Sequence, residues 1–407
     1  MFSPLFLVLS LPLSRFADVM KLPFTSAHFS AAVAAMLVSY GSSAVIIYQA
    51  AQSFGATDAQ IASWFTILGL VCGVLTWALS VRHRAPVMIA WCTPGAAMMV
   101  GLEGVSLPQA VGAFMFAAGL MWLVSATGFF DRLVRQIPAT LAAAMLAGIL
   151  INFGSRVFVA MQSQTALVGL MLAVYLLAKI RFPRYGILLM LLAGFAYAAL
   201  GGMLDWQAFR AAPPHLEWVA PQWHAGHLIG VGIPLFIAAL APQNVPGMAV
   251  MRAYGYQTPA KPLISSAAAA TVLTAPLGTF MVNLAAISAA LCMGGEVDKD
   301  PQRRYLATVL LAGFYLLSGA AGGMVVSLFA ALPGELLTAL AGIAVFGTLQ
   351  ANLLAAWQDE ATREASLLTL LASASGMNLL GISSAFWGLL IGLAVYHLNR
   401  WVSAQQG

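Results

Sequence analysis

The sequence predicts an all-α integral membrane protein with fourteen transmembrane segments in two inverted seven-span repeats, in which short β-strands lead into half-helices at spans 3 and 10. Three observations support this fold class. Only 8% of the residues are charged and 61% are hydrophobic, whereas soluble chains carry about 25% charged residues. Basic residues gather in clusters between long charge-free runs. Similar sequences recur 194 or 195 residues apart.

The charge-free runs are each long enough to hold one or two membrane helices of about 20 residues. Cys72, Cys92 and Cys292 fall inside such runs, so we expect them to be buried apolar side chains that form no disulfide framework. The runs are 29–57, 59–81, 85–102, 104–130, 218–251, 262–295, 305–334 and 365–399.

The basic clusters predict the number of crossings. Positive charge stays on the cytoplasmic side of short loops, and 16 of the 18 Lys and Arg residues fall in eight clusters. If every cluster faces the cytoplasm, each of the seven intervals contains an even number of crossings, and two in each give fourteen. Both termini are then cytoplasmic. The clusters are Arg15 and Lys21; Arg82 and Arg84; Arg132 and Arg135; Lys179, Arg181 and Arg184; Arg252 and Lys261; Lys299, Arg303 and Arg304; Arg363; and Arg400.

One interval is too short for two ordinary helices. Only 34 charge-free residues separate Lys261 from Lys299, where two full crossings need about 40. One crossing must therefore be short or broken, and a Pro-Leu-Gly turn puts the break before span 10, at 279–294. The interval before Arg132 likewise predicts a short span 3, at 85–101.

The two short crossings are seven spans apart, which indicates an internal repeat. Residues 118–125 resemble 312–318, and residues 137–149 resemble 332–343. Because seven is odd, the second repeat is inverted in the membrane relative to the first. Inverted repeats with paired interrupted helices are typical of secondary transporters.

These spans divide the chain into four parts. The short apolar run near the N-terminus is too short to span a membrane and lacks the order of a signal peptide. It is either an interfacial tail or an upstream extension, with translation starting at Met1 or Met20. The parts are an N-terminal tail at 1–28, a first repeat at 29–204, a periplasmic connector at 205–225 and a second repeat at 226–401.

Each short span is predicted to be an extended piece followed by a half-helix. The residue before a proline favours an extended backbone, so Thr93 is predicted to be the N-cap of a half-helix that starts at Pro94. In span 10, Asn283 is predicted to be the N-cap of a helix at 284–293, after a β-prone stretch at 279–282. We expect the two extended pieces to pair with each other, since exposed backbone is not tolerated in lipid.

Paired breaks would bring two half-helix N-termini together near the middle of the membrane. Each N-terminus offers free N–H groups and a charge of about +0.5, a combination that binds anions. A proline kink in a packed helix is the structural alternative for span 3. Small residues beside both N-termini would let a flat ligand approach the backbone: Gly95, Ala96, Ala97, Ala285 and Ala286.

Span 8 carries two adjacent amides, Gln243 and Asn244, between two prolines. They either satisfy the carbonyls that the prolines free or bind a ligand, and both roles are compatible. Span 1, the repeat partner of span 8, has Tyr40 and Ser43 at a similar depth. Tyr40 is placed to stack on a ring or to pack in the core.

These residues resemble the BenE-type benzoate transporter family, whose members share the uracil-permease or nucleobase-ascorbate transporter fold. The resemblance covers nearly the whole chain from Met20 onward. It implies a core domain of spans 1–4 and 8–11 and a gate domain of spans 5–7 and 12–14, with the substrate between half-helices 3 and 10. Its most specific pieces are 40–44, 49–51, 91–97, 243–247, 285–290 and 381–388.

In residue numbers, the resemblance implies a core domain at 29–130 and 226–330 and a gate domain at 131–204 and 331–401. It also implies a homodimer through the gate domains. The residues that we expect at the substrate are Thr93, Pro94, Gly95, Ala96, Gln243, Asn244, Asn283, Leu284, Ala285, Ala286, Tyr40 and Ser43.

The function that the resemblance implies is import of benzoate or a similar aromatic monocarboxylate by proton symport, with alternating access, in a bacterial inner membrane. A nucleobase permease of the same fold is the alternative. The nucleobase relatives place glutamates on spans 8 and 10, where this chain has Gln243, Asn244 and Asn283. Amides and helix N-termini suit an anion better than a nucleobase.

Proton coupling is left without an obvious carrier, because no carboxylate is predicted in mid-membrane. Glu335 is a candidate, although an acid in the first turn of a helix also stabilises the helix dipole. An anion channel or an intramembrane enzyme is less well supported, because the chain has an inverted repeat and has no His-Glu-x-x-His motif or Asp-rich motif for a phosphate-bound metal. We expect no cofactor, no metal and no nucleic acid partner.

Overall fold

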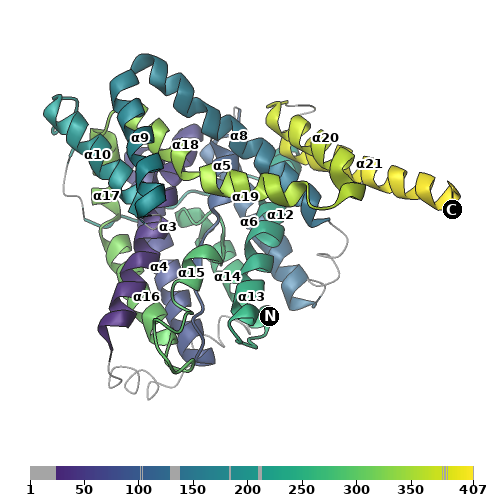
Figure 1. Cartoon of the computed structure of the whole chain (residues 1–407), viewed down its shortest axis with the longest axis horizontal. Helices are drawn as coiled ribbons and strands as arrows, with labels where there is room; N and C mark the ends of the chain where they lie inside the picture. Colours follow the sequence, from purple (N-terminus) through teal and green to yellow (C-terminus); the bar gives the residue numbers. More distant parts are fainter. Residues whose placement is uncertain are drawn as a thin grey trace.

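The computed structural model describes residues 24–406 except 101, 103, 129–137, 183–184, 210–212, 378, 380–381 and 383. Most of this part is helical, and it contains one two-stranded sheet (Figure 1). The predicted helical architecture is therefore confirmed, and so are the two short strands. Residues 1–23, with both predicted translation starts, lie outside the described residues.

The helices and strands fall into two series along the chain, before and after residues 201–224. The first series is α3 (Ser26–Ser53), α4 (Asp58–His83), β1 (Ile89–Trp91), α5 (Thr93–Met99), α6 (Leu107–Ala126), α8 (Ala139–Ser163), α9 (Thr165–Arg181) and α10 (Gly186–Leu200). The second is α11 (Ala225–His227), the π-helical turn η2 (Leu228–Gly232), α12 (Ile233–Ala239), the π-helical turn η3 (Leu240–Asn244), α13 (Val245–Ala253), α14 (Ala260–Thr274), the 3₁₀ turn η4 (Ala275–Leu277), β2 (Val282–Leu284), α15 (Ile287–Ala290), α16 (Tyr305–Ala320), α17 (Gly322–Ala331), α18 (Gly334–Ala344), α19 (Phe346–Ala356), the 3₁₀ turn η5 (Glu360–Thr362), α20 (Arg363–Ala374) and α21 (Ser384–Gln406).

Six helical segments of the described part are long and apolar enough to cross a membrane, or seven if α16 and α17, bent by 65° at their junction, form one more. This is compatible with a polytopic membrane protein. The fourteen crossings and the inverted repeat remain predictions. The six segments are Ser26–Ser53, Asp58–His83, Leu107–Ala126, Ala139–Ser163, Ala225–Ala253 and Gly334–Ala356.

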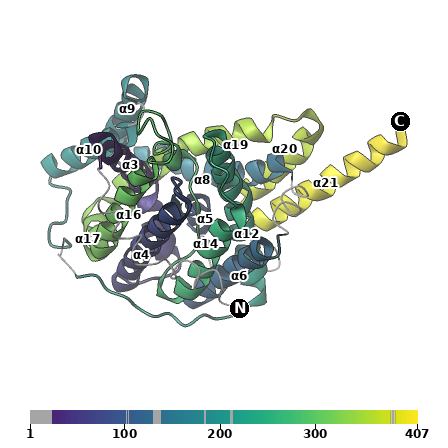
Figure 2. The same cartoon turned by 90° about the horizontal axis from the view of Figure 1, so that it is seen from below.

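The helices form two groups (Figures 1 and 2). In one group α4 packs against α16 and α17, and α14 packs against α6, with the strands and α3 between them. In the other group α8 packs against α18, α19 and α20, and α9 packs against α10. The last helix, α21, packs against α20 and then extends away from the rest of the molecule (Figure 1).

Glycines allow the closest of these helix contacts. A Cβ added to Gly69 of α4 would lie 2.5 Å from the Cα of Gly319 on α16, and one added to Gly319 would lie 2.8 Å from the carbonyl oxygen of Thr66. The two backbones therefore touch without intervening side chains. Small residues at helix contacts are the usual way in which membrane helices gain packing.

We expect Gly319→Ala to lower the thermal unfolding temperature in detergent, because the new methyl group must push α4 and α16 apart. Overpacking of this kind costs about 1–3 kcal/mol. Gly313→Ala is the matched control on the same helix, since nothing lies within 4 Å of its added Cβ. That change should be neutral or stabilise the protein by about 0.5–1 kcal/mol. Equal losses from both variants would contradict close α4–α16 packing.

The two strands lie at the centre of the first group and pair with each other, as predicted. Their register is antiparallel, with Ala90 opposite Asn283 at the middle of the ladder. Two further hydrogen bonds extend it, from Cys92 N to Met281 O (2.9 Å) and from Ala285 N to Met88 O (3.0 Å). Segments almost 200 residues apart are thus joined through their backbones.

Threonines on neighbouring helices close the outer edges of this small sheet. Thr76 of α4 donates its hydroxyl to the carbonyl of Ile89 (3.2 Å) and accepts the N–H of Ile89 (3.0 Å). On the other side, Thr271 of α14 accepts the N–H of Val282 (3.2 Å). Buried backbone groups must find partners, so these threonines make a two-stranded sheet tolerable inside the helix bundle.

Candidate functional site

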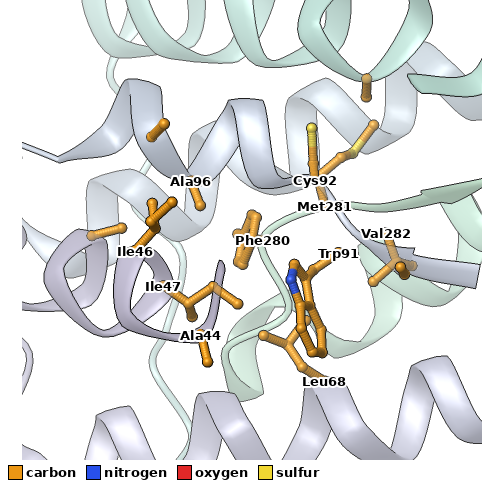
Figure 3. Close-up of a cluster of buried hydrophobic side chains, with 14 of the residues drawn as sticks. Ala44, Ile46, Ile47, Leu68, Trp91, Cys92, Ala96, Phe280, Met281 and Val282 are labelled. Atoms are coloured by element: carbon orange, nitrogen blue, oxygen red, sulfur yellow. The ribbon is translucent and has the colours of Figure 1, made fainter. Parts of the chain in front are cut away.

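The strand pair is surrounded by apolar side chains from α3 and α4. Figure 3 shows Trp91 of β1 beside Leu68 of α4, with Val282 of β2 nearby. Trp91 and Val282 are 3% and 2% exposed, and Leu68 is 1% exposed. The candidate site is therefore built on a rigid, dry support, as a site that must hold a fixed geometry requires.

Tyr40 and Ser43, predicted to lie at the site, both contact Trp91. The Trp91 indole Nε1–H donates to Ser43 Oγ at 2.6 Å, and Ser43 donates in turn to the carbonyl of Ser39 at 2.6 Å. Tyr40 meets the Trp91 ring edge to face, with ring centroids 5.0 Å apart. Since its hydroxyl is occupied in this way, Ser43 fixes the orientation of Trp91.

The predicted cap of the first half-helix is displaced by one residue. The N-cap is Cys92, whose carbonyl accepts the N–H of Ala96 at 2.8 Å, and α5 begins at Thr93 with Pro94 as its second residue. Thr93 is therefore not the N-cap. The helix begins one residue earlier than predicted because the carbonyl of Cys92 already accepts an i+4 N–H, while its own N–H still belongs to the strand ladder.

Gly95 has a packing role that the sequence did not reveal. Its missing side chain is opposite Leu235 of α12, and an added Cβ would collide with that side chain. Ala96 is fully buried. We predicted that small residues here let a ligand approach the backbone, but the space at Gly95 is already filled by α12.

The prediction for the second half-helix is wrong. Asn283 lies in the middle of strand β2 rather than at a helix N-cap, and Leu284 ends the strand. The helix that follows, α15, spans only Ile287–Ala290, and its N-cap is Ala286. An asparagine followed by a helix-forming run favours a cap locally, but pairing with β1 satisfies the backbone of this segment and outweighs that preference.

These corrections weaken the predicted anion site. A charge of about +0.5 belongs to the aligned peptide dipoles of a longer helix, whereas α5 has seven residues and α15 has four. Two strong helix N-termini do not converge here. Recognition of a negatively charged ligand must therefore depend largely on side-chain donors.

Two amide side chains meet beside the strand pair. Asn283 Nδ2 donates to Gln243 Oε1 at 3.4 Å. Asn283 is 1% exposed, and its Oδ1 has no hydrogen-bond partner among the described residues. A buried polar atom without a partner is rare in native proteins and often marks a functional position. Gln243 is only half-buried, so it is the more exposed residue of this pair.

Asn244, next in sequence to Gln243, is used differently. It is 1% exposed, its Oδ1 accepts the N–H of Leu284 at 3.0 Å, and its Nδ2 lies 3.8 Å from the sulfur of Met121. The side chain thus ties the middle of the α12–α13 segment to strand β2. Its oxygen and one of its two N–H groups are thus engaged within the protein, whereas we expected this amide to face a ligand.

The two amides lie in η3, a π-helical turn of five residues. π-helical turns are rare and frequently occur at functional sites. Pro242 and Pro246 explain this one, because they remove backbone donors and loosen the helix there. Immediately after the turn, Gly247 lets β2 approach, since an added Cβ would lie 2.6 Å from the Cβ of Leu284.

The other predicted residues lie on the periphery of this arrangement. Ala285 continues the strand ladder, and Ala286 is the N-cap of α15. Glu335 starts α18, as predicted, and its carboxylate accepts the Ser163 hydroxyl of α8 at 3.4 Å, which is a contact between helices of the second group.

Three features of the site escaped the sequence prediction. They are the threonine contacts to the strand edges, the tie from Asn244 to Leu284, and a buried pair of His28 and Asp298 at the start of α3. The threonine contacts join residues 11 and 13 positions apart, whereas the other two features join more distant parts of the chain. The only local signal was the spacing of Thr25 and His28, which matches that of a capping box.

Residues 23–398 match the family model of BenE, described as benzoate membrane transport protein. Two curated relatives are similar over most of their length. The inner membrane protein YdcO of Escherichia coli is 41% identical over 363 residues, which cover 89% of this chain and 93% of YdcO. The benzoate membrane transport protein of Acinetobacter baylyi is 39% identical over 370 residues, with the same coverage of 89% and 93%.

Solved structures of an anion transporter share the fold. The inward-facing structure of murine Slc26a9 matches with a TM-score of 0.59 at 12% identity, over 96% of this chain and 71% of that one. A second structure, of SLC26A9, matches with a TM-score of 0.55 at 14% identity, over 90% of this chain and 65% of that one. At such low identity the likeness concerns the fold alone.

Proposed function

Because the chain belongs to the benzoate membrane transport protein family, we propose that it imports benzoate or a similar aromatic monocarboxylate by proton symport. It is a membrane transporter of the benzoate type and not an enzyme. The mechanism, the coupling ion and the location of the substrate site are parts of the proposal.

The observation that best supports the location of the substrate site is the contact between the amides of Gln243 and Asn283. Since Gln243 Oε1 already accepts from Asn283, the Nε2 group of Gln243 remains to donate to a carboxylate. A hydrogen bond to a charged group contributes about 1.5–3 kcal/mol. Tyr40, half-buried, offers an aromatic face to the ring of the substrate.

The strand pair and the helix packing support an inverted repeat in this proposal. α4 follows the start of the first repeat as α14 follows the start of the second, and each packs against a helix of the other repeat, α16 and α6 respectively. The antiparallel strands, one from each repeat, pair with each other between these helices. In this proposal the fourteen crossings include short and broken helices, and substrate binds where the two repeats meet.

The two groups of helices correspond to the proposed domains. The group around the strands contains elements of 29–130 and 226–330, the proposed core, and the group around α8 contains elements of 131–204 and 331–401, the proposed gate. Movement of the core against the gate would expose the site to each side in turn, and a homodimer would form through the gates.

The orientation in the proposal follows from the basic clusters, which put both termini in the cytoplasm of a bacterium and the protein in its inner membrane. A reporter fused behind Gln406 tests this orientation. Activity of a cytosol-dependent reporter is the expected result, and activity of a periplasm-dependent reporter would reverse the orientation.

Counterflow in proteoliposomes tests the transported substrate. We expect vesicles loaded with unlabelled benzoate to take up labelled benzoate, and an inside-alkaline pH gradient to stimulate uptake further. Protein-free liposomes are the control, because benzoic acid crosses lipid unaided. Labelled uracil and sulfate should not exchange. Exchange of uracil without benzoate would instead identify a nucleobase permease.

A further inference from the structure

A buried histidine closes the first turn of α3. His28 is 0% exposed, and its Nδ1 accepts the backbone N–H of Thr25 at 3.1 Å. An imidazole nitrogen that accepts a hydrogen bond carries no proton, so the proton of neutral His28 lies on Nε2. That nitrogen is 3.2 Å from Oδ2 of Asp298, whose side chain is 14% exposed. The neutral imidazole thus joins the helix cap to a carboxylate.

Two other helices show that the cap does not require a histidine. In α4 and α6 the same third position is filled by Gln60 and Gln109, whose side chains accept the N–H of the capping residue at 2.9 and 3.1 Å. Glutamine makes the capping bond and cannot bind a proton. In the described part of the chain, His28 is the only Asp, Glu, His, Lys or Arg residue in the buried class. The histidine therefore adds a nitrogen that can bind a proton, which capping does not require.

Asp298 lies on a loop that is held firmly between α15 and α16. Arg304 donates to the carbonyls of Asp298 (2.7 Å) and Met293 (2.9 Å). Tyr256 donates its hydroxyl to the carbonyl of Pro301 at 2.9 Å, and burial raises the pKa of Tyr256, so it remains a neutral donor. The loop continues α15 and β2, and β2 carries Asn283. Asp298 and the proposed substrate site are therefore joined by one short segment of the chain.

Among the described residues, the charged groups that act on His28 come from this loop. They are the Asp298 carboxylate and the Arg303 guanidinium, whose Nε lies 3.7 Å from Asp298 Oδ2. α15 and α16, which pack against α3, carry no Asp, Glu, His, Lys or Arg. Two other helices that pack on α3 carry ionisable residues of these types. On α18 this residue is Glu335, which contacts Ser163, and on α4 they are Asp58, Arg82 and His83 at the ends of the helix.

We propose that His28 and Asp298 form the proton-binding pair through which a pH gradient drives transport. One proton binds at His28 Nδ1, where it displaces the N–H of Thr25 and converts the pair into an imidazolium–carboxylate ion pair. Release of the same proton restores the cap. Proton binding thus alters how the start of α3 is held against the loop behind α15. α3 also carries Tyr40 and Ser43, so both elements linked by the pair lead to the proposed site.

The inference rests on proton symport as proposed above. Counterflow and gradient-driven uptake are the two measurements that distinguish failure of the inference from failure of the proposed function. Benzoate counterflow requires no net proton movement, whereas gradient-driven uptake does. For the wild type we expect an inside-alkaline gradient of one pH unit to stimulate uptake by up to about tenfold, the ratio that one pH unit can drive. His28→Gln keeps the capping acceptor and removes the titratable nitrogen. It should keep counterflow but show stimulation below about twofold in the same gradient.

Asp298→Asn provides a second variant with the same expected loss of stimulation. Gln60→Ala is the control for capping alone, because it removes a capping bond without removing a proton site, and it should keep gradient-driven uptake. Normal stimulation in His28→Gln and Asp298→Asn would overturn the inference and leave the proposed function standing. Counterflow by the wild type without any stimulation by the gradient would overturn proton symport, and the inference with it.

Discussion

Gln243→Glu is expected to lower benzoate uptake at neutral pH by roughly tenfold or more relative to Gln243→Ala, because both variants lose the amide donor but only the glutamate adds repulsion between two carboxylates. The new side chain has the same shape, and one of its oxygens still accepts from Asn283, as Oε1 does now. The other oxygen replaces the Nε2 donor, so a carboxylate faces the carboxylate of the substrate. No buried cation of the described part offsets this charge.

The pH dependence of this variant separates charge from shape. As the introduced carboxylate protonates at lower pH, it becomes a donor again and uptake should partly recover. Uptake of labelled benzoate by proteoliposomes at several pH values measures this, with the neutral analogue benzamide as a competitor that should be affected less. If Gln243→Glu transports benzoate as well as Gln243→Ala at neutral pH, the carboxylate does not bind at Gln243.

The strand pair was predictable because it follows from spacing. Cationic clusters limit the length available for each crossing, and proline and glycine mark where a short crossing breaks. Since extended backbone in a bilayer needs a partner, two breaks at matching positions predict a pair of strands. The details were not predictable from local propensity. Asn283 favours a helix cap in isolation, and only β1, almost 200 residues away, makes it a strand residue.

The different roles of the two adjacent amides also could not be predicted from the sequence. Gln243 and Asn244 have the same chemistry and the same two flanking prolines, so both were predicted to bind the ligand. Successive side chains of a helix point about 100° apart, and only the structure shows that Asn244 is the one that faces β2 while Gln243 remains half-buried. Gly95 was assigned to ligand access for a similar reason, because a sequence cannot show that Leu235 packs against it.

The structure therefore predicts different effects on stability for two neighbouring truncations. Asn244→Ala leaves the N–H of Leu284 buried without a partner, which costs about 1–3 kcal/mol, and it frees β2 from the α12–α13 segment. We expect a lower thermal unfolding temperature in detergent together with loss of benzoate transport.

Gln243→Ala is the matched control, because Gln243 is half-buried and accepts only one long hydrogen bond, at 3.4 Å. It should weaken benzoate transport, to a level that is still measurable, with little change in the unfolding temperature. Paired measurements of unfolding temperature and benzoate binding on both variants separate a residue that supports the site from one that contacts the ligand. An Asn244→Ala protein that unfolds at the wild-type temperature but no longer binds benzoate would restore Asn244 to the substrate and contradict the contact with Leu284 as its main role.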